Sequence, residues 1–340
     1  MQQRELPIYR IKPGMMVAQD IYDHKRNLLI PQNTHLTRAM ITKIKMHKVK
    51  KMMVYIESIK DFMAFNEAFV RSVREFKNMI NDVISKNREI NIERLSKELD
   101  ALIIDKNTSF RVFEMLHHIR VYDDLTYVHS LNVALICYVM AKWLGFSKEE
   151  ERTLCLCGLL HDVGKMKIPI DIIKKPSCLS PEEFNVVKSH TLLGYSVLKH
   201  EDISECIKRV ALMHHEKCDG TGYPAGLLDE QIDDYAKIVA IADVYDAMTS
   251  DRVYRKGVCP FQVIELFEDE GFQKYNPKFL LPFLEHAVTT YINNKVRLSN
   301  QTVGRIVMIN KSALSRPVVC IDNEFIDLSV EKNLKIEAVL

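Results

Sequence analysis

The sequence predicts a mainly α protein, in which an all-α helical bundle follows a small β-rich domain and precedes a short β appendage. The stretch 111–298 reads as helical almost throughout, with proline and glycine confined to a few loops such as 220–226. The two flanks instead carry short apolar and β-branched runs between turn residues. We therefore predict four parts: a β-rich accessory domain at 1–57, a helical linker at 58–118, the helical domain at 119–298 and the β appendage at 299–340.

The first part is predicted from turn signals and short apolar runs. Pro13-Gly14 marks a turn, and the apolar runs 28–31 and 52–56 read as two short strands. A short helix is expected between these strands, over 38–47.

A long amphipathic helix is predicted to follow from residue 61. Its apolar residues recur at steps of three or four, which is the period of one helical face: Phe62, Phe65, Phe69, Val73, Phe76, Ile80 and Val83. This face has two readings. It packs on its own domain, or it pairs with the same helix of a second copy in a homodimer through 62–83.

The appendage is predicted from two β-branched runs, 302–309 and 317–321, which are separated by polar turns. Between the flanks, Cys155 and Cys157 lie in an apolar segment. Eight cysteines without a C-x-x-C spacing indicate reduced thiols, and we interpret this pair as core residues rather than as a redox or metal site.

Composition excludes several classes of protein. With 47% hydrophobic and 27% charged residues the chain has a globular composition, which argues against disorder. Lys and Arg number 47 against 45 Asp and Glu, so no broad basic field exists for a nucleic-acid duplex. The longest apolar stretch, 130–146, is interrupted by Asn132 and Lys142, and no membrane span is predicted. The N-terminus lacks the pattern of a secretory signal, so we expect a cytoplasmic location.

Residue types that bind metals recur within the helical domain. They fall into five groups separated by 32, 29, 24 and 29 residues, namely His129, His161-Asp162, His190, His214-His215 and Asp243. Each gap is about the length of an antiparallel helix pair, so successive helices can deliver their side chains to one interior point. A single histidine in such a setting is usually a hydrogen-bonded core residue. The set together predicts a metal centre, because buried imidazoles and carboxylates need partners.

The pair His161-Asp162 suggests how two metals share the centre. Adjacent residues on a helix point about 100° apart, so His161 can bind one metal while Asp162 bridges toward a second. Mixed His and Asp ligands suit iron, manganese or zinc, and among these we expect iron or manganese. Two cations about 3.5–4 Å apart would hold a bridging hydroxide for in-line attack on phosphorus, which is phosphoester hydrolysis.

Further residues fit a phosphate substrate. Lys165 lies three positions after Asp162 and can offset negative charge, although a solvated lysine at a helix end is the alternative. Arg252 and Arg255 carry guanidinium groups suited to a phosphodiester, although surface arginines are common. In the loop 219–224, Gly222 permits a close approach of the backbone, Tyr223 provides an aromatic ring and Pro224 stiffens the chain. Without the preceding histidine pair, these residues would indicate only an ordinary turn.

Two segments resemble a known family. His161-Asp162-Val163-Gly164-Lys165 resembles the H-D-x-x-K signature of the HD hydrolase superfamily, and 214–224 matches the H-H-E-x-x-D-G-x-G-Y-P signature of HD-GYP domains. The similar stretch, 122–287, is about half of the chain. The resemblance implies an HD-type bundle and a bacterial signalling enzyme, a phosphodiesterase that hydrolyses cyclic di-GMP to pGpG and often onward to GMP. Residues 1–57 are similar to a small domain that precedes some HD-GYP domains.

The resemblance also implies roles for individual residues. His129, His161, Asp162 and Asp243 would hold one metal, and Asp162 would bridge to a second held by His190 and His214. Lys165, Arg252 and Arg255 would face the phosphate.

One position departs from the family. Members with three metals carry a glutamate four residues before the first histidine, where this chain has Leu125, so a two-metal centre is expected. His215 then either completes the second metal's ligands or orients one of them, and the role of Asp246, one turn from Asp243, stays open.

Two other functions remain possible at the level of sequence. A protein of this family could bind a cyclic dinucleotide without cleaving it and pass the signal through the helix at 62–83. It could also hydrolyse another cyclic dinucleotide, because the loop 219–224 does not distinguish guanine from adenine.

Overall fold

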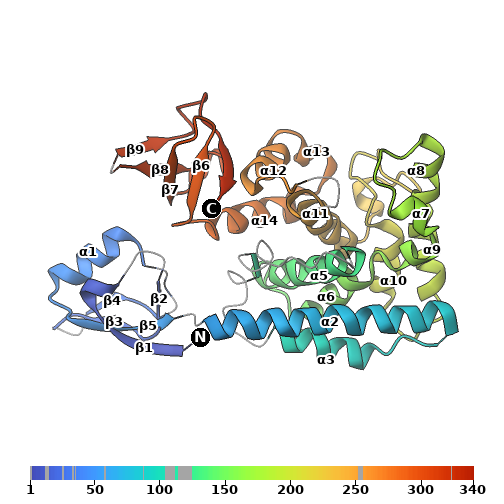
Figure 1. Cartoon of the computed structure of the whole chain (residues 1–340), viewed down its shortest axis with the longest axis horizontal. Coiled ribbons are helices and arrows are strands. Elements are labelled where there is room, and N and C mark those ends of the chain that lie inside the picture. The colour runs from blue at the N-terminus through green and yellow to red at the C-terminus, as the bar shows by residue number, and fades with distance from the viewer. Residues whose placement is uncertain are drawn as a thin grey trace. The chain divides into compact units, whose positions relative to one another are not determined.

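A computed structural model gives the structure of the chain. It describes residues 2–11, 15–24, 27–32, 34, 36–56, 59–86, 88–103, 112–113, 125–251, 256–322 and 324–340, with the backbone alone at 2, 38–39, 56, 59–64 and 125. The described chain forms two compact units, 1–67 and 68–340 (Figure 1). It is mainly helical with strand regions toward both ends, so the predicted fold class is confirmed.

The first unit is a small β structure with one α-helix and one short 3-10 helix. Its strands are β1 (Gln2–Pro7), β2 (Met16–Val17), β3 (Ile21–Tyr22), β4 (Leu28–Ile30) and β5 (Lys51–Ile56), and its helices are η1 (Ile8–Arg10) and α1 (Arg38–Met46). The antiparallel order β1-β5-β2 forms one sheet, and β3 pairs with β4 in another. Val17, Leu36, Ile44 and Val54 are fully buried in its core.

Most of the predicted elements of this unit are confirmed. The strands at 28–31 and 52–56 correspond to β4 and β5, and the helix between them is α1, where the hydroxyl of Thr37 accepts a hydrogen bond from the Met40 amide at 3.2 Å. The predicted turn at Pro13-Gly14 lies outside the described residues.

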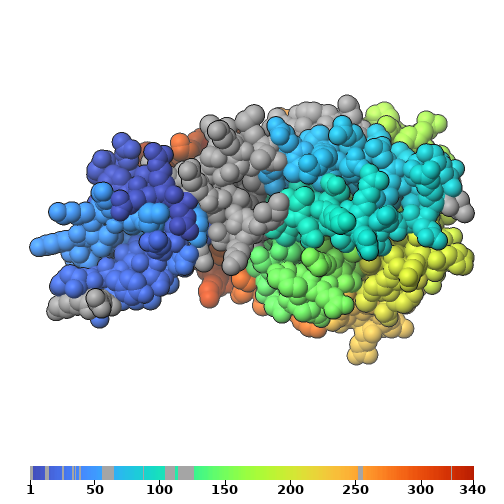
Figure 2. Space-filling view, turned by 90° about the horizontal axis from the view of Figure 1, so that it is seen from below, coloured from blue at the N-terminus to red at the C-terminus, as the bar shows by residue number. Residues whose placement is uncertain are grey.

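The second unit contains the greater part of α2 (Ile59–Lys86) and all of α3 (Ile92–Leu102), which lie side by side (Figure 2). The apolar face of α2 is buried within the chain at Phe69, Val73, Phe76, Ile80 and Val83. Phe76 also meets the ring of Tyr127 edge to face at 5.8 Å. The structure therefore supports the first reading, in which this face packs on its own domain. A homodimer through 62–83 stays a prediction, and the buried side chains named here are not available to form it.

The centre of the second unit is a bundle of α5 (Leu125–Trp143), α6 (Lys148–Leu160), α10 (Glu205–Met213) and α11 (Asp234–Thr249), with η2 (Val163–Lys167) and α9 (His190–Leu198) beside it (Figure 1). Helix α5 is buried on every side between 127 and 141, as a helix with no polar face should be. Helix α6 begins with a capping box in which Ser147 and Glu150 satisfy each other's backbone amides. Cys155 and Cys157 are buried, as predicted.

Short elements complete the helical part. They are α7 (Ile170–Ile173), α8 (Pro181–Lys188), η3 (Asp229–Gln231), α12 (Pro260–Leu266), η4 (Phe267–Gly271), α13 (Phe272–Lys274) and α14 (Pro277–Thr289). Helix α14 packs on α5 and α11, where Phe283 meets the ring of Tyr245 edge to face at 5.2 Å. No helix in the described part of the chain is long and apolar enough to cross a membrane.

The chain closes with a five-stranded antiparallel sheet of order β10-β6-β7-β8-β9. Its strands are β6 (Lys295–Leu298), β7 (Val303–Met308), β8 (Val318–Ile321), β9 (Glu324–Asp327) and β10 (Ile336–Val339). The two predicted runs correspond to β7 and β8. The prediction that helical structure reaches residue 298 is wrong, because β6 alternates exposed and buried residues and pairs with both β7 and β10.

Two carboxylates connect the sheet to α12 and η4. Glu268 accepts hydrogen bonds from the amides of Leu314 and Ser315 at 2.6 and 3.1 Å. Glu265 forms ion pairs with Arg316 at 2.9 Å and Lys335 at 3.1 Å. The division into linker, helical domain and appendage stays a prediction.

Candidate metal centre

Five segments of the second unit carry the predicted metal-binding residues. His129 lies on α5, His190 begins α9, His214 and His215 follow α10, and Asp243 lies on α11. The prediction that His161 and Asp162 lie on a helix is wrong. Helix α6 ends at Leu160, so the pair occupies the turn before η2, and His161 acts as the C-cap residue.

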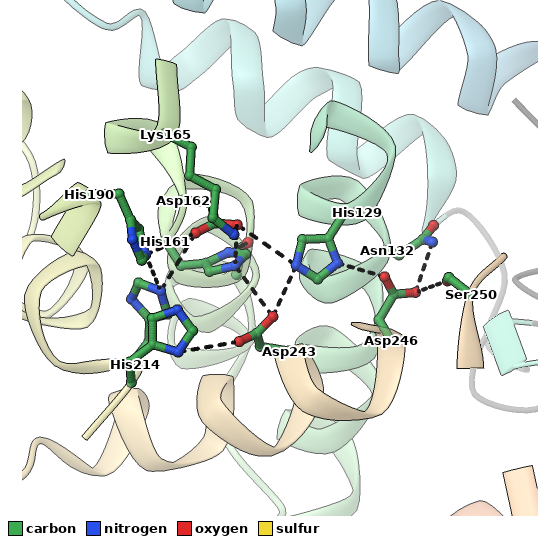
Figure 3. A network of polar contacts seen from close by, with 12 residues as sticks. His129, Asn132, His161, Asp162, Lys165, His190, His214, Asp243, Asp246 and Ser250 are labelled. Carbon is green, nitrogen blue, oxygen red and sulfur yellow. Dashed lines mark hydrogen bonds and ion pairs between the residues drawn. The ribbon is translucent and has the colours of Figure 1, made fainter. Parts of the chain in front are cut away.

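The structure brings all these side chains together in two adjoining groups (Figure 3). Within each group the possible ligand atoms lie within 4.8 Å of one another. The first group is His129, His161 and Asp243, and the second is Asp162, His190, His214 and His215. All of them are buried except His215, which is half-buried.

Asp162 belongs to the second group and lies beside the first, and it offers one oxygen to the histidines of each. Its Oδ2 lies 3.3 Å from Nε2 of His161 and 3.8 Å from Nε2 of His129. Its Oδ1 lies 3.3 Å from Nε2 of His190 and 3.6 Å from Nε2 of His214. This arrangement suits a carboxylate that bridges two cations. It arises from the turn before η2, and not from the spacing of about 100° between neighbouring residues on a helix.

Backbone carbonyls fix the tautomers of three of the histidines. Nδ1 of His161 lies 2.7 Å from the Gly158 carbonyl, and the Nδ1 atoms of His190 and His214 lie 2.6 and 3.1 Å from other carbonyls. A carbonyl only accepts, so each Nδ1 carries the proton and each neutral ring presents the lone pair of Nε2. In metal-ligating histidines, too, the ring nitrogen that does not bind the metal donates a hydrogen bond.

These lone pairs converge without hydrogens between them. The Nε2 atoms of His190 and His214 face each other at 3.2 Å. Among the described residues, Nε2 of His161 and Oδ1 of Asp162 are buried and have no hydrogen-bond partner. Such a cluster of acceptors is costly in a dry interior unless cations occupy it. The donor set of imidazoles and carboxylates therefore fits divalent transition metals.

The charge states agree with this donor set. Burial lowers the pKa of His190 to about 3 and also lowers that of His214, so both rings stay neutral. Burial alone would raise the pKa of Asp162, but Lys165 and His161 hold it well below the usual range. Asp243 behaves likewise beside His129, so both carboxylates are ionised.

His129 has a carboxylate partner that the sequence left undecided. Its Nδ1 lies 2.6 Å from Oδ2 of Asp246, and its Nε2 lies 2.9 Å from Oδ1 of Asp243. Burial lowers the pKa of His129, but the hydrogen bonds to Asp243 and Asp246 raise it to about 9. Asp246 is in turn held by Asn132 and Ser250, each donating to Oδ1 at 2.9 Å (Figure 3). Asp246 therefore orients His129.

Replacing Asp246 by asparagine is expected to weaken metal binding by about 10–100-fold, because the partner that orients His129 loses its charge. Competition with a chelator, followed by metal analysis, measures the change. Ser250→Ala removes only one of the donors to Asp246 and should stay within a few-fold of the native affinity. Unchanged affinity in Asp246→Asn would show that the carboxylate does not support the centre.

Lys165 and the loop after the histidine pair border the centre. Lys165 Nζ pairs with Oδ2 of Asp162 at 2.5 Å, so it lies beside the candidate ligands, and its contact with a phosphate stays a prediction. The Tyr223 ring stacks on His215 with centroids 4.7 Å apart, and His215 Nδ1 lies 3.9 Å from Oδ2 of Asp243. His215 thus contacts both groups, and burial holds its pKa well below the usual value.

Glu216 holds this loop in place, a role that the sequence did not reveal. Its carboxylate is buried and accepts hydrogen bonds from the amides of Ala225 at 2.7 Å and Leu227 at 2.9 Å. At position 222 a Cβ atom would lie 2.4 Å from Cα of Glu216, so only glycine allows the loop to approach this closely. Pro224 lies in the same loop, whereas Arg252 and Arg255 lie outside the described residues.

Comparisons with known proteins place the chain in a family. A model described as "HD domain" matches residues 89–279, which is more than half of the 340 residues. A cyclic di-GMP phosphodiesterase of Pseudomonas aeruginosa is 36% identical over 198 residues, covering 58% of this chain and 48% of that protein. A cyclic di-GMP phosphodiesterase of Thermotoga maritima is 35% identical over 179 residues, covering 52% of this chain and 49% of that protein.

Other comparisons add a second substrate name and a fold. A 3'3'-cGAMP-specific phosphodiesterase of Vibrio cholerae is 37% identical over 145 residues, covering 43% of this chain and 34% of that protein. The alignments span about half the length of the first two relatives. An HDG"Y"P protein from Bdellovibrio bacteriovorus has the same fold with a TM-score of 0.52 at 15% identity, covering 83% of this chain and 98% of that one. The chain belongs to the HD domain family and carries the Gly222-Tyr223-Pro224 sequence of its HD-GYP members.

Proposed function

We propose that this protein is a metal-dependent phosphodiesterase that hydrolyses cyclic di-GMP. The observation that supports this most is the convergence of Nε2 lone pairs and carboxylate oxygens on the two sides of Asp162, because such a centre suits paired cations. Paired cations can lower the pKa of water and stabilise the charge that develops at phosphorus in an in-line displacement.

Each group of ligands would hold one cation. His129, His161 and Asp243 would hold the first, His190, His214 and His215 the second, and Asp162 would bridge them. The reacting phosphodiester needs further positive charge, which Lys165 would supply from beside Asp162. Arg252 and Arg255 remain predicted phosphate contacts, and Gly222, Tyr223 and Pro224 predicted substrate contacts.

The reaction consumes one water molecule. The water oxygen forms a bond to phosphorus, the bond between phosphorus and the 3'-oxygen breaks, and the 3'-oxygen leaves with a proton. Cyclic di-GMP opens in this way to pGpG, which carries a 5'-phosphate. A second hydrolysis of the same kind would give GMP.

The names of the relatives favour the same substrate class. Proteins named as cyclic di-GMP phosphodiesterases occur among them, which supports cyclic di-GMP as the substrate. Two relatives from Vibrio cholerae are named as 3'3'-cGAMP-specific, so 3'3'-cGAMP is the second candidate. A binder without activity is disfavoured, because a mere receptor does not need this set of ligands. We place the enzyme in the cytoplasm.

Anaerobically purified protein is expected to contain about two equivalents of iron or manganese per chain and to convert cyclic di-GMP to pGpG. Metal analysis gives the stoichiometry, and chromatography of timed samples separates pGpG from GMP. Competition between cyclic di-GMP and 3'3'-cGAMP assigns the preferred substrate. Tight binding of cyclic di-GMP without turnover under iron, manganese and zinc would instead support a receptor.

A further inference from the structure

Lys188 is a half-buried cation beside the metal centre that has no role so far. It ends α8, two residues before His190. Its Nζ lies 4.9 Å from the centroid of the Phe184 ring and 5.4 Å from that of the Tyr223 ring. The ammonium group is therefore held between α8 and the loop that carries Gly222, Tyr223 and Pro224.

Among the described residues, Lys165 and Lys175 are paired with carboxylates, but Lys188 is not. Lys165 pairs with Asp162 at 2.5 Å, and Lys175 pairs with Glu183 at 2.6 Å. Across the part of the chain that the structure describes, no ion pair joins Lys188 to a carboxylate, and its contacts are the faces of two aromatic rings. Ring faces attract the positive charge but offer no oxygen or nitrogen acceptor, so the ammonium group keeps N–H donors for an anion.

Contacts link this ammonium group to the metal-binding residues. The Tyr223 ring lies 4.7 Å from that of His215 and 6.4 Å from that of His190, measured between centroids. Lys188 is thus one side chain removed from the second group of ligands. An anion bound at the metal centre and extending past Tyr223 would meet its ammonium group.

A cyclic dinucleotide has the charge pattern that this arrangement fits. It carries two phosphodiesters, of which one is cleaved at the metal centre while the other keeps its negative charge. That second charge leaves bulk water when the ligand binds, and it needs a cation. We propose that Lys188 binds the phosphodiester that is not being cleaved, and so favours cyclic dinucleotides over diesters with a single phosphate. This inference rests on the proposed function.

A purely structural role is the alternative. A lysine at a helix C-terminus interacts favourably with the helix dipole, and its contact with Tyr223 could steady the loop. Loss of that role would impair every substrate equally. Binding of a second phosphate predicts instead that only the substrate with two phosphates is affected.

The test compares Lys188→Met with the native enzyme on two substrates, cyclic di-GMP and bis(4-nitrophenyl) phosphate, which has one phosphate. Lys188→Met is expected to raise KM for cyclic di-GMP about tenfold or more, the size of one lost charge-assisted hydrogen bond. Its kcat/KM for bis(4-nitrophenyl) phosphate should stay within about twofold of native. Lys188→Arg should recover most of the affinity for cyclic di-GMP, because it keeps the charge.

Lys199→Met is the matched control, because Lys199 is an exposed lysine just beyond α9. It should leave both substrates unchanged. An equal loss of activity on the two substrates in Lys188→Met would overturn the inference in favour of the structural role. An unchanged KM for cyclic di-GMP would overturn it as well.

A separate binding measurement distinguishes failure of this inference from failure of the proposed function. If native protein cleaves neither substrate with iron, manganese or zinc, the proposed function fails. Equilibrium dialysis with labelled cyclic di-GMP still compares the native protein, Lys188→Met and Lys188→Arg. About tenfold weaker binding in Lys188→Met alone supports the assignment of Lys188, and equal binding, or none by any of them, rejects it.

Discussion

Replacing Asp162 by asparagine is expected to remove both cations and to lower kcat/KM by about a thousandfold or more. Asp162 offers Oδ2 to Nε2 of His161 and Oδ1 to Nε2 of His190, each at 3.3 Å, so its loss affects both groups of ligands. A neutral amide loses the charge and presents an NH₂ group to one set of lone pairs. Metal ions supply several kcal/mol of transition-state stabilisation, and about 4 kcal/mol corresponds to a thousandfold in rate.

Metal analysis and cyclic di-GMP turnover on the same sample measure this prediction. Asp202→Asn is the matched control, because Asp202 is exposed beyond the C-terminus of α9 and should leave both quantities unchanged. Circular dichroism shows whether Asp162→Asn keeps its helical content. A folded variant that retains two cations and native turnover would contradict the bridging role.

The candidate metal-binding set was predictable from the sequence because its members differ so clearly from their surroundings. Asp243 follows a run of apolar residues on α11, and His161 follows one on α6. Polar residues of ligand type in buried helices are rare enough to be informative. The structure brings each of the seven predicted ligands to one place, which spacing alone suggested only in outline.

The residues that orient the candidate ligands were not predictable in the same way. Asn132 lies three residues after His129, and Asp246 three after Asp243, which indicates shared helical faces and nothing more. Their meeting depends on how α5 packs against α11, and that packing joins residues 117 positions apart. The sequence did not predict the turn that carries His161 and Asp162, since no glycine or proline lies at 161–163, directly after α6, to mark the end of the helix.

The ends of the fold show the limits of local patterns more plainly. Strands β7 and β8 are rich in β-branched residues, and the sequence predicted them. Strand β10 is four residues long and is defined by pairing with β6, about 40 positions earlier in the chain. The same pairing makes 295–298 a strand, where a local reading continued the helix.

Gly164→Ala is expected to separate the two segments that carry Asp162 and His190. A Cβ atom at position 164 would lie 2.0 Å from the carbonyl oxygen of His190 and 2.4 Å from the amide nitrogen of Gly194. Both are backbone atoms, so no side chain can rotate to make room. The segment η2 must therefore move away from α9. Overpacking of this kind costs about 3 kcal/mol, which is roughly 5–10 °C in melting temperature for a unit of this size.

The opposing glycine provides the control. A Cβ at position 194 would meet its nearest neighbour, the amide nitrogen of Gly164, at 3.4 Å, which is an ordinary contact. Gly194→Ala should therefore keep activity and gain up to about 1 kcal/mol, because alanine favours the helix. A native melting temperature and metal content in Gly164→Ala would show that the two segments tolerate separation. Loss of both in Gly164→Ala alone would show that this backbone contact sets the distance between the ligands, since a shift of about 1 Å at such a site can cost a hundredfold in rate.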